Sequence, residues 1–494
     1  LEESYKISKE CEQIINKHRN FYQDYEDRIA FNNTIHQTFE HAIEVCYLLH
    51  QNTQQIKYLC KAFDYFEKSK AYTLLQSIQE MQALRYTDVP NEILEQERDL
   101  KTQITYNEKQ LNQAYAKKEN TKIKKYQKIL FEKRKEYRQL INKLENKFPA
   151  YYKLKYNPTK VKVEEVQAYL DNQTALLEYF EGDHTIYYLA IQKDDIQLFQ
   201  HPKTETWQTT YANFHQSLTQ KEKVFDSEKI EETYDTFVEN AHALFQILLA
   251  PYVNTLAPNI TKLQIIPDGK LSYIPFEILL QNPATNRRPN YRNLDYLLTK
   301  YAVGYVYSAT LLLEQQIGKK TDTTENYGGF APIYHNETMQ AYKGLIAEYK
   351  ENKVYSIALR EGLEDLPDAR KSVSHIAQLM KGKAFLAKEA TKEKFVQLVS
   401  NFKILHLAMH GLVDHENPLY SKLVFTPEDN TQNHLLEAGD LYNMEINAHL
   451  TVLSACNTGY GKMRKGEGVM SLSRAFTYAG CPSVIMSLWS VPDL

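Results

Sequence analysis

Two short apolar runs near the end of the chain constrain its fold more than any other feature. They span residues 403–411 (KILHLAMHG) and 450–459 (LTVLSACNTG), and each stops at a reactive side chain beside small residues. Uninterrupted apolar runs of this length fit parallel strands that are buried on both faces of a sheet. Ligands and chemistry collect beyond the carboxyl ends of such strands. We therefore expect His410 and Cys456 to lie side by side at one edge of a sheet.

A thiol beside an imidazole predicts a cysteine nucleophile with a histidine base. The pKa of a free thiol is about 8.5, so only a small fraction is thiolate at neutral pH. An imidazole can take the thiol proton as attack begins and later protonate the leaving amine. Gly411 and Cys456 would supply the backbone N–H groups that stabilise the oxyanion. The alternative is an inert His and an inert Cys at two strand ends.

Composition limits the other classes of function. A chain of 494 residues is too long for one core, so two or three domains are expected. A net charge of −3 gives no reason to expect nucleic acid or an anionic membrane as partner. The sequence has no apolar run long enough to span a bilayer, and its five cysteines lack the spacing of a disulfide framework. These features predict a cytoplasmic protein, although a missing leader before Leu1 would overturn that expectation.

Residues 1–82 contain no proline or glycine and are predicted to be helical throughout. Apolar side chains recur at three- and four-residue steps in two consecutive segments: Phe39, Ala42, Ile43, Cys46 and Leu49, then Leu59, Ala62, Phe63, Phe66 and Ala71. Two such helices resemble one unit of a tetratricopeptide-type repeat, truncated at the N-terminus. We expect these repeats to bind a regulatory partner protein, or else to act as a spacer, with Cys11, Cys46 and Cys60 in their core.

Residues 83–148 are predicted to form an antiparallel helical hairpin that bends at residues 117–121 (KKENT). Glutamates alternate with its many basic residues, which favours a solvated face over a nucleic-acid site. Residues 149–315 and 316–494 then alternate between helical and strand patterns, the signature of a parallel α/β sheet. Strands are expected at 175–180, 185–191, 196–199, 263–266, 328–331 and 483–488, and helices at 163–170, 368–380, 391–399 and 469–479.

Five motifs in order give the chain a family resemblance. HLAMHG, NPLYSKLVF, LSACNTGYG, KGEGVMSLSRAF and AGCPSVIMSLWSVPD together resemble the CHAT domain, a module related to caspases and separase. The resemblance extends from about Pro149 to the C-terminus. It implies a caspase-like parallel sheet flanked by helices, with an inactive first half (149–315) and a catalytic second half (316–494). His410 and Cys456 fall in the catalytic positions of a dyad that needs no cofactor or metal.

Other polar residues of the second half receive structural interpretations. His406 and His410 are four residues apart, but their segment is predicted to be a strand and lacks the glutamate of zinc peptidases, so we expect no metal site. His406 should instead be hydrogen-bonded beneath the dyad. Glu467 is interpreted as a cap at the start of a helix rather than a substrate ligand. Cys481 is interpreted as packing.

The segment 488–493 (LWSVPD) resembles the separase segment whose acidic residue pairs with an arginine of the substrate. We therefore place Asp493 and Trp489 in the substrate-binding site, where a carboxylate would favour a basic residue. Relatives continue beyond this strand, so the C-terminus is expected to be incomplete.

The function predicted from the resemblance is that of a regulated cysteine endopeptidase acting on a protein substrate. A catalytically silent scaffold is the alternative.

Overall fold

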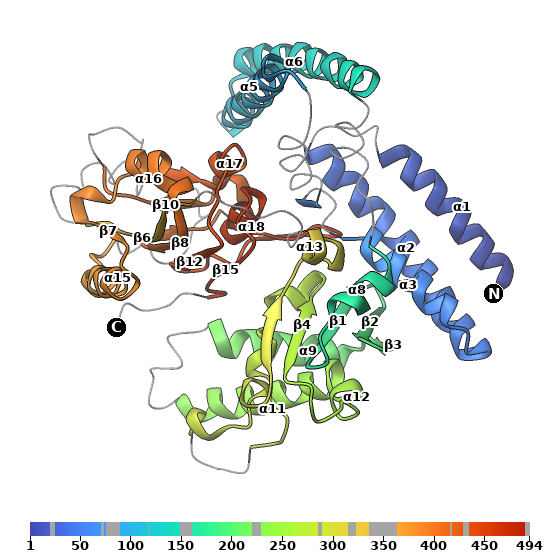
Figure 1. Cartoon of the computed structure of the whole chain (residues 1–494). Coiled ribbons are helices and arrows are strands. Elements are labelled where there is room, and N and C mark those ends of the chain that lie inside the picture. The colour runs from blue at the N-terminus through green and yellow to red at the C-terminus, as the bar shows by residue number, and fades with distance from the viewer. Residues whose placement is uncertain are drawn as a thin grey trace.

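The computed structural model describes residues 1–19, 25–70, 74–75, 89–116, 118–148, 161–219, 229–284, 289–314, 323–334, 363–414, 417–427 and 434–489. Helices dominate up to residue 148, and two separate mixed α/β regions follow (Figure 1). Among the described residues, no helix is both long enough and apolar enough to cross a membrane.

Three helices precede the hairpin: α1 (Glu2–Arg19), α2 (Tyr25–Thr53) and α3 (Ile56–Lys68). Their predicted apolar stripe is buried, with Ile43 and Cys46 fully enclosed. The stripe packs against strand residues such as Phe180 and Leu189 as well as against neighbouring helices. The repeat-like helices thus share a core with the first sheet, whereas the sequence suggested a stack that buries its faces only against itself.

The helical hairpin consists of α5 (Asn91–Ala116) and α6 (Asn120–Lys147), with its bend where the sequence placed it. Figure 1 shows the two helices side by side at one end of the molecule. A small core of its own includes Leu100, Tyr137 and Leu144. Arg134 pairs with Glu108 across the hairpin at 3.0 Å, consistent with mixed charges on a solvated face.

The first sheet has five strands in the order β3-β2-β1-β4-β5. Its strands are β1 (Thr174–Glu181), β2 (Thr185–Gln192), β3 (Asp195–Pro202), β4 (Lys262–Ile266) and β5 (Ala302–Tyr305). The strands β1, β4 and β5 are parallel, and β2 and β3 complete an antiparallel meander. The sequence located the first four strands but missed β5, whose short run AVGY carries little periodicity.

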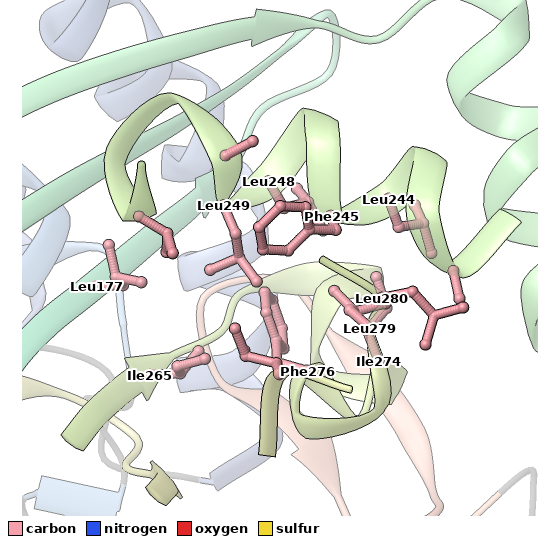
Figure 2. Packing of buried hydrophobic residues seen from close by; sticks show 14 of the residues in the cluster. Leu177, Leu244, Phe245, Leu248, Leu249, Ile265, Ile274, Phe276, Leu279 and Leu280 are labelled. Carbon is pink, nitrogen blue, oxygen red and sulfur yellow. The ribbon is translucent and has the colours of Figure 1, made fainter. Parts of the chain in front are cut away.

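Helices cover the first sheet on both faces. They are α8 (Val163–Tyr169), α9 (Glu205–Thr219), α11 (Ile230–Leu248), α12 (Ala250–Val253) and α13 (Ala309–Glu314). Figure 2 shows α11 above the sheet, with Phe245 and Leu248 close to Leu177 and Ile265 of the strands. After β4 the chain forms two short 3₁₀ helices, Gly269–Tyr273 and Phe276–Ile278.

The second sheet is fully parallel, with the strand order β15-β12-β8-β6-β7. Its strands are β6 (Glu325–Ala331), β7 (Lys383–Leu386), β8 (Phe402–Ala408), β12 (Leu450–Ser454) and β15 (Val484–Ile485). The predicted strand at 483–488 is therefore limited to two residues. The sequence analysis did not predict β7. Most of the segment between β6 and α15 lies outside the described residues.

Helices lie on both faces of the second sheet. α15 (Pro367–Met380) packs on one face through Val373, against Ala331 and Ala408. The other face carries α16 (Lys392–Leu398), α17 (Ala438–Leu441) and α18 (Leu472–Tyr478). The predicted helix at 469–479 is shorter than expected, because Gly468–Met470 form strand β14, which pairs with β13 (Lys462–Arg464) in a hairpin. A further small sheet contains β9 (Gly411–Leu412), β10 (Lys422–Val424) and β11 (Leu435–Glu437).

Candidate active site

The register of β8 and β12 brings His410 and Cys456 to the same edge of the second sheet. The last pair of the parallel ladder is Ser454 with Ala408, and the N–H of Met409 donates to Ser454 O at 3.3 Å. His410 and Cys456 each follow the last paired residue of their strand by two positions, so both lie just beyond the carboxyl ends of neighbouring parallel strands. Both residues are half-buried.

Gly411 lies against the backbone of Cys456. A Cβ atom at this position would lie 2.9 Å from the Cys456 carbonyl oxygen, so the approach depends on glycine. The N–H of Val424 donates to His410 O at 3.1 Å, so the next pair of the antiparallel ladder, Leu423 with Gly411, is a non-hydrogen-bonded pair. In such a ladder the N–H of the next residue, Gly411, points away from β10. That orientation suits a donor to an oxyanion.

The turn after Cys456 has a fixed backbone. Asn457 adopts a left-handed conformation with φ of 58°, which asparagine tolerates better than most residues. Its N–H donates to the carbonyl oxygen of Trp489 at 3.2 Å, and Gly459 N donates to Ser487 O at 2.9 Å. A Cβ at Gly459 would lie 2.7 Å from the sulfur of Met486. The chain after β15 therefore holds the turn that presents the thiol.

A backbone carbonyl orients the imidazole of His410. Its Nε2 lies 2.7 Å from the carbonyl oxygen of Glu364. A carbonyl only accepts hydrogen bonds, so Nε2 carries the proton and Nδ1 of the neutral ring is left with the lone pair of a base. The sequence indicated no third member for the dyad. It could not, because the group is a main-chain oxygen 46 residues upstream in a stretch without periodicity.

Tyr334 makes a second contact with His410. Its ring meets the imidazole edge-on with 4.7 Å between centroids. Its hydroxyl accepts from His410 N at 3.2 Å and donates to Val424 O at 2.6 Å. Tyr334 is almost fully buried, and it therefore fixes the backbone of His410 as well as one side of the ring.

His406 lies on β8, four residues before His410, and is buried and hydrogen-bonded, as the sequence suggested. Its Nδ1 is 2.9 Å from the hydroxyl of Tyr327 and its Nε2 is 2.9 Å from Ser454 Oγ. Burial lowers the pKa of His406 to about 4, so the ring is neutral over the physiological range. With both nitrogens hydrogen-bonded, His406 is unsuited to ligate a metal. Among the described residues, no group of His, Cys, Asp and Glu could hold a metal ion.

The substrate-binding positions expected from the sequence are only partly described. Asp493 lies outside the described residues, so its position relative to Cys456 stays a prediction. Trp489 is half-buried, and its carbonyl oxygen binds the residue after the thiol. The structure thus brings Trp489 to the turn that carries Cys456 through a backbone contact.

The other thiols range from fully buried to half-buried. Cys481 is fully buried, with its sulfur 3.2 Å from Thr451 Oγ1. Burial raises the pKa of Cys46 to about 12 and also raises the pKa of Cys60. Cys11 and Cys60 are half-buried rather than fully in the helical core.

Glu467 has a different role from the helix cap that the sequence suggested. The cap of α18 is Ser471, whose side chain accepts from Arg474 N. The carboxylate of Glu467 instead pairs with Arg474 at 2.6 Å and accepts from Asn32 Nδ2 of α2 at 2.8 Å. Glu467 and Arg474 are both almost fully buried, so the pair joins the Cys456 side of the molecule to the N-terminal helices.

Comparison with known proteins identifies related sequences. A model of the CHAT domain matches residues 238–494. Tetratricopeptide repeat protein 28 from Homo sapiens is 25% identical over 289 residues, a match that covers 51% of this chain and 11% of the human protein. The protein of the same name from Mus musculus is 24% identical over 289 residues, with the same coverage. This chain therefore corresponds to a small part of the length of these relatives.

Proposed function

This chain belongs to the CHAT domain family, and from that premise we propose that it is a regulated cysteine endopeptidase acting through Cys456 and His410. The observation that carries the proposal is the parallel pairing of β8 and β12, which ends two residues before His410 and Cys456, so that both follow neighbouring strand ends at one edge of the sheet. The hydrogen bond from His410 Nε2 to Glu364 O supports the role of base, because it leaves Nδ1 to accept a proton.

The reaction follows from these positions. The imidazole of His410 takes the thiol proton as Cys456 Sγ bonds to the peptide carbonyl carbon. The oxyanion receives hydrogen bonds from the N–H groups of Gly411 and Cys456. Collapse breaks the C–N bond, and the imidazolium gives its proton to the leaving amine. Water, deprotonated by His410, then hydrolyses the thioester and restores the thiol.

A peptide with an electrophilic end group tests the proposal. We expect covalent modification of the wild-type protein, measured by intact mass, and none of the Cys456→Ala variant. Cys60→Ala is the matched control, since it removes a half-buried thiol far from the sheet edge and should leave the modification unchanged. Modification that persists in Cys456→Ala, or its absence from the wild type, would instead favour the silent scaffold.

Specificity for a basic residue before the cleaved bond is the finer part of the proposal. The carboxylate of Asp493 would pair with an arginine of the substrate. Trp489, in the same segment of the chain, would line the same site. Cleavage of matched arginine and aspartate peptide libraries measures this preference. We expect Asp493→Ala to abolish a preference for arginine; an unchanged preference would remove Asp493 from the site.

The N-terminal helices are proposed to bind a regulatory partner or the substrate. Two relatives of the chain are named for tetratricopeptide repeats, and α1 exposes apolar side chains at Ile7 (53%) and Ile14 (59%) although its opposite face is packed. A reactive thiol is best kept in a reducing compartment, so we place the protein in the cytoplasm. New N-termini that appear in cells with the wild type and not with Cys456→Ala would identify the substrate.

A further inference from the structure

The two groups that contact the His410 imidazole come from separate chain segments. Tyr334 lies three residues after β6, whereas Glu364 lies three residues before α15. Neither segment is a strand or a helix at the point of contact, so the ladder of the sheet does not fix it. Something else must hold both segments against the imidazole.

One ion pair joins these two segments. The carboxylate of Asp365, next to Glu364, accepts from the N–H of Tyr334 at 3.1 Å. Arg370 donates to the same carboxylate through both terminal nitrogens, at 2.8 and 2.5 Å, and to the carbonyl oxygen of Pro332 at 3.0 Å. Its side chain is 19% exposed and that of Asp365 is 25% exposed, so water screens the pair only in part.

Arg370 belongs to the first turn of α15, which packs on β6, β7 and β8. The guanidinium thus transmits the position of a packed helix to both segments around the imidazole. Its planar geometry binds a carboxylate with two parallel hydrogen bonds and keeps another donor for a carbonyl. Lysine, a point charge on a flexible stem, cannot reproduce this arrangement.

We propose that Arg370 and Asp365 are positioning residues of the dyad, holding the Glu364 carbonyl on Nε2 of His410 and so keeping Nδ1 unprotonated for the thiol. This inference rests on the proposed function, because it concerns the base of that reaction. Neither residue touches the substrate. Without the ion pair, the imidazole gains a second tautomer and further orientations, and the efficiency of the base falls.

The rate of Cys456 alkylation by iodoacetamide as a function of pH tests the inference without a known substrate. Of the titratable and charged groups in the described part of the chain, Tyr334 contacts the imidazole, and Asp365 and Arg370 hold the segments of Tyr334 and Glu364 around it. In the wild type we expect reactivity below the ordinary thiol pKa of about 8.5, because the imidazole assists. In Arg370→Ala this low-pH reactivity should fall about tenfold and the profile should approach that of an unassisted thiol.

Two further variants separate positioning from folding. Arg370→Lys keeps the charge and should restore little of the low-pH reactivity. Lys371→Ala is the matched control: it breaks the pair with Asp368 one residue further along α15, where the Lys371 side chain is 77% exposed, and should leave the profile unchanged. An Arg370→Ala or Arg370→Lys protein that is less stable to heat but keeps the wild-type profile would overturn the inference.

Failure of the proposed function gives a different result. If the wild-type protein itself shows only an unassisted thiol profile at Cys456, the dyad is absent and the positioning role falls with it. If the wild type shows assistance and the Arg370 variants retain it, the dyad stands and only the positioning role is wrong.

Discussion

The parallel strands β1 and β4 of the first sheet end at Glu181 and Ile266, and the parallel strands β8 and β12 of the second sheet end at Ala408 and Ser454. Polar side chains follow both pairs of ends. In the first sheet these side chains make hydrogen bonds and ion pairs with other side chains and with the backbone, and α2 covers them. In the second sheet His410 and Cys456 are half-buried at an edge. The same strand arrangement therefore supports contacts that stabilise the fold in one half and carries the candidate active site in the other.

The edge of the first sheet is closed by hydrogen bonds. Asp268 is 3% exposed, accepts from Glu181 N at 2.8 Å and lies 3.7 Å from His36 of α2. Burial opposes ionisation of Asp268, but the attraction of His36 and Lys70 and the hydrogen bond from the Glu181 N–H together outweigh it, and the pKa of Asp268 is lowered. Glu181 binds Lys203 at 2.6 Å. Carboxylates held by such contacts stabilise the fold. The two edges differ because α2 covers the edge of the first sheet.

The largest difference should appear when a histidine is removed from each edge in turn and the reactivity of Cys456 is compared. His410→Ala should lower the rate of Cys456 modification by a peptide electrophile about 100- to 10,000-fold, because it removes the general base. His36→Ala, which removes the histidine of α2 at the edge of the first sheet, should leave that rate unchanged in the folded protein. The second-order rate of modification measures both. Equal losses in the two variants would break the comparison.

The next effect concerns the connection between the two edges. Glu467→Ala removes the carboxylate that balances the charge of the buried Arg474 guanidinium, which should lower the free energy of unfolding by about 3–5 kcal/mol. Urea denaturation measures this change. The double variant Glu467→Ala/Arg474→Met removes both charges and should regain much of the loss. A single variant as stable as the wild type would show that the ion pair does not hold the β13–β14 hairpin to α2.

Acid should weaken the second sheet through His406. Its pKa is about 4 in the folded protein, below the ordinary value of 6.5. As the pH falls, the unfolded chain therefore binds a proton at His406 before the folded protein does. The contribution of the neutral, buried ring to stability is fully present above pH 6.5 and is lost as the pH falls toward 4. The loss should approach about 3 kcal/mol. Urea midpoints between pH 8 and 4.5 measure it, and His406→Gln should remove this part of the pH dependence.

The smallest effect should come from the closed edge of the first sheet. Asp268→Ala leaves the buried N–H of Glu181 without its acceptor and should cost about 1–3 kcal/mol. The rate of Cys456 modification in the folded protein should stay the same. Asp268→Asn retains an acceptor oxygen and should cost less. A slower reaction at Cys456 with unchanged stability would mean that the first edge has a part in the chemistry.

The sequence by itself determined the strands β8 and β12 and the residues that follow them. Their apolar runs are long enough to demand burial on both faces, so the two ends had to meet at one edge. The helical hairpin and the stripe of α2 followed from the three- and four-residue spacing in the same way. The helix proposed for 469–479 lost its first turn to β14, because pairing with β13 outweighed the local pattern.

Only the tertiary structure decided which polar groups at the strand ends are fixed and which orient the candidate base. The Glu364 carbonyl and the Asp365–Arg370 pair carry no periodic signal, since a hydrogen bond between distant segments depends on how helices and strands pack. Glu467 looked like a helix cap, yet its partners include Asn32, 435 residues away. Local spacing specifies a face or a strand end, whereas long-range packing specifies the partner that each polar group meets.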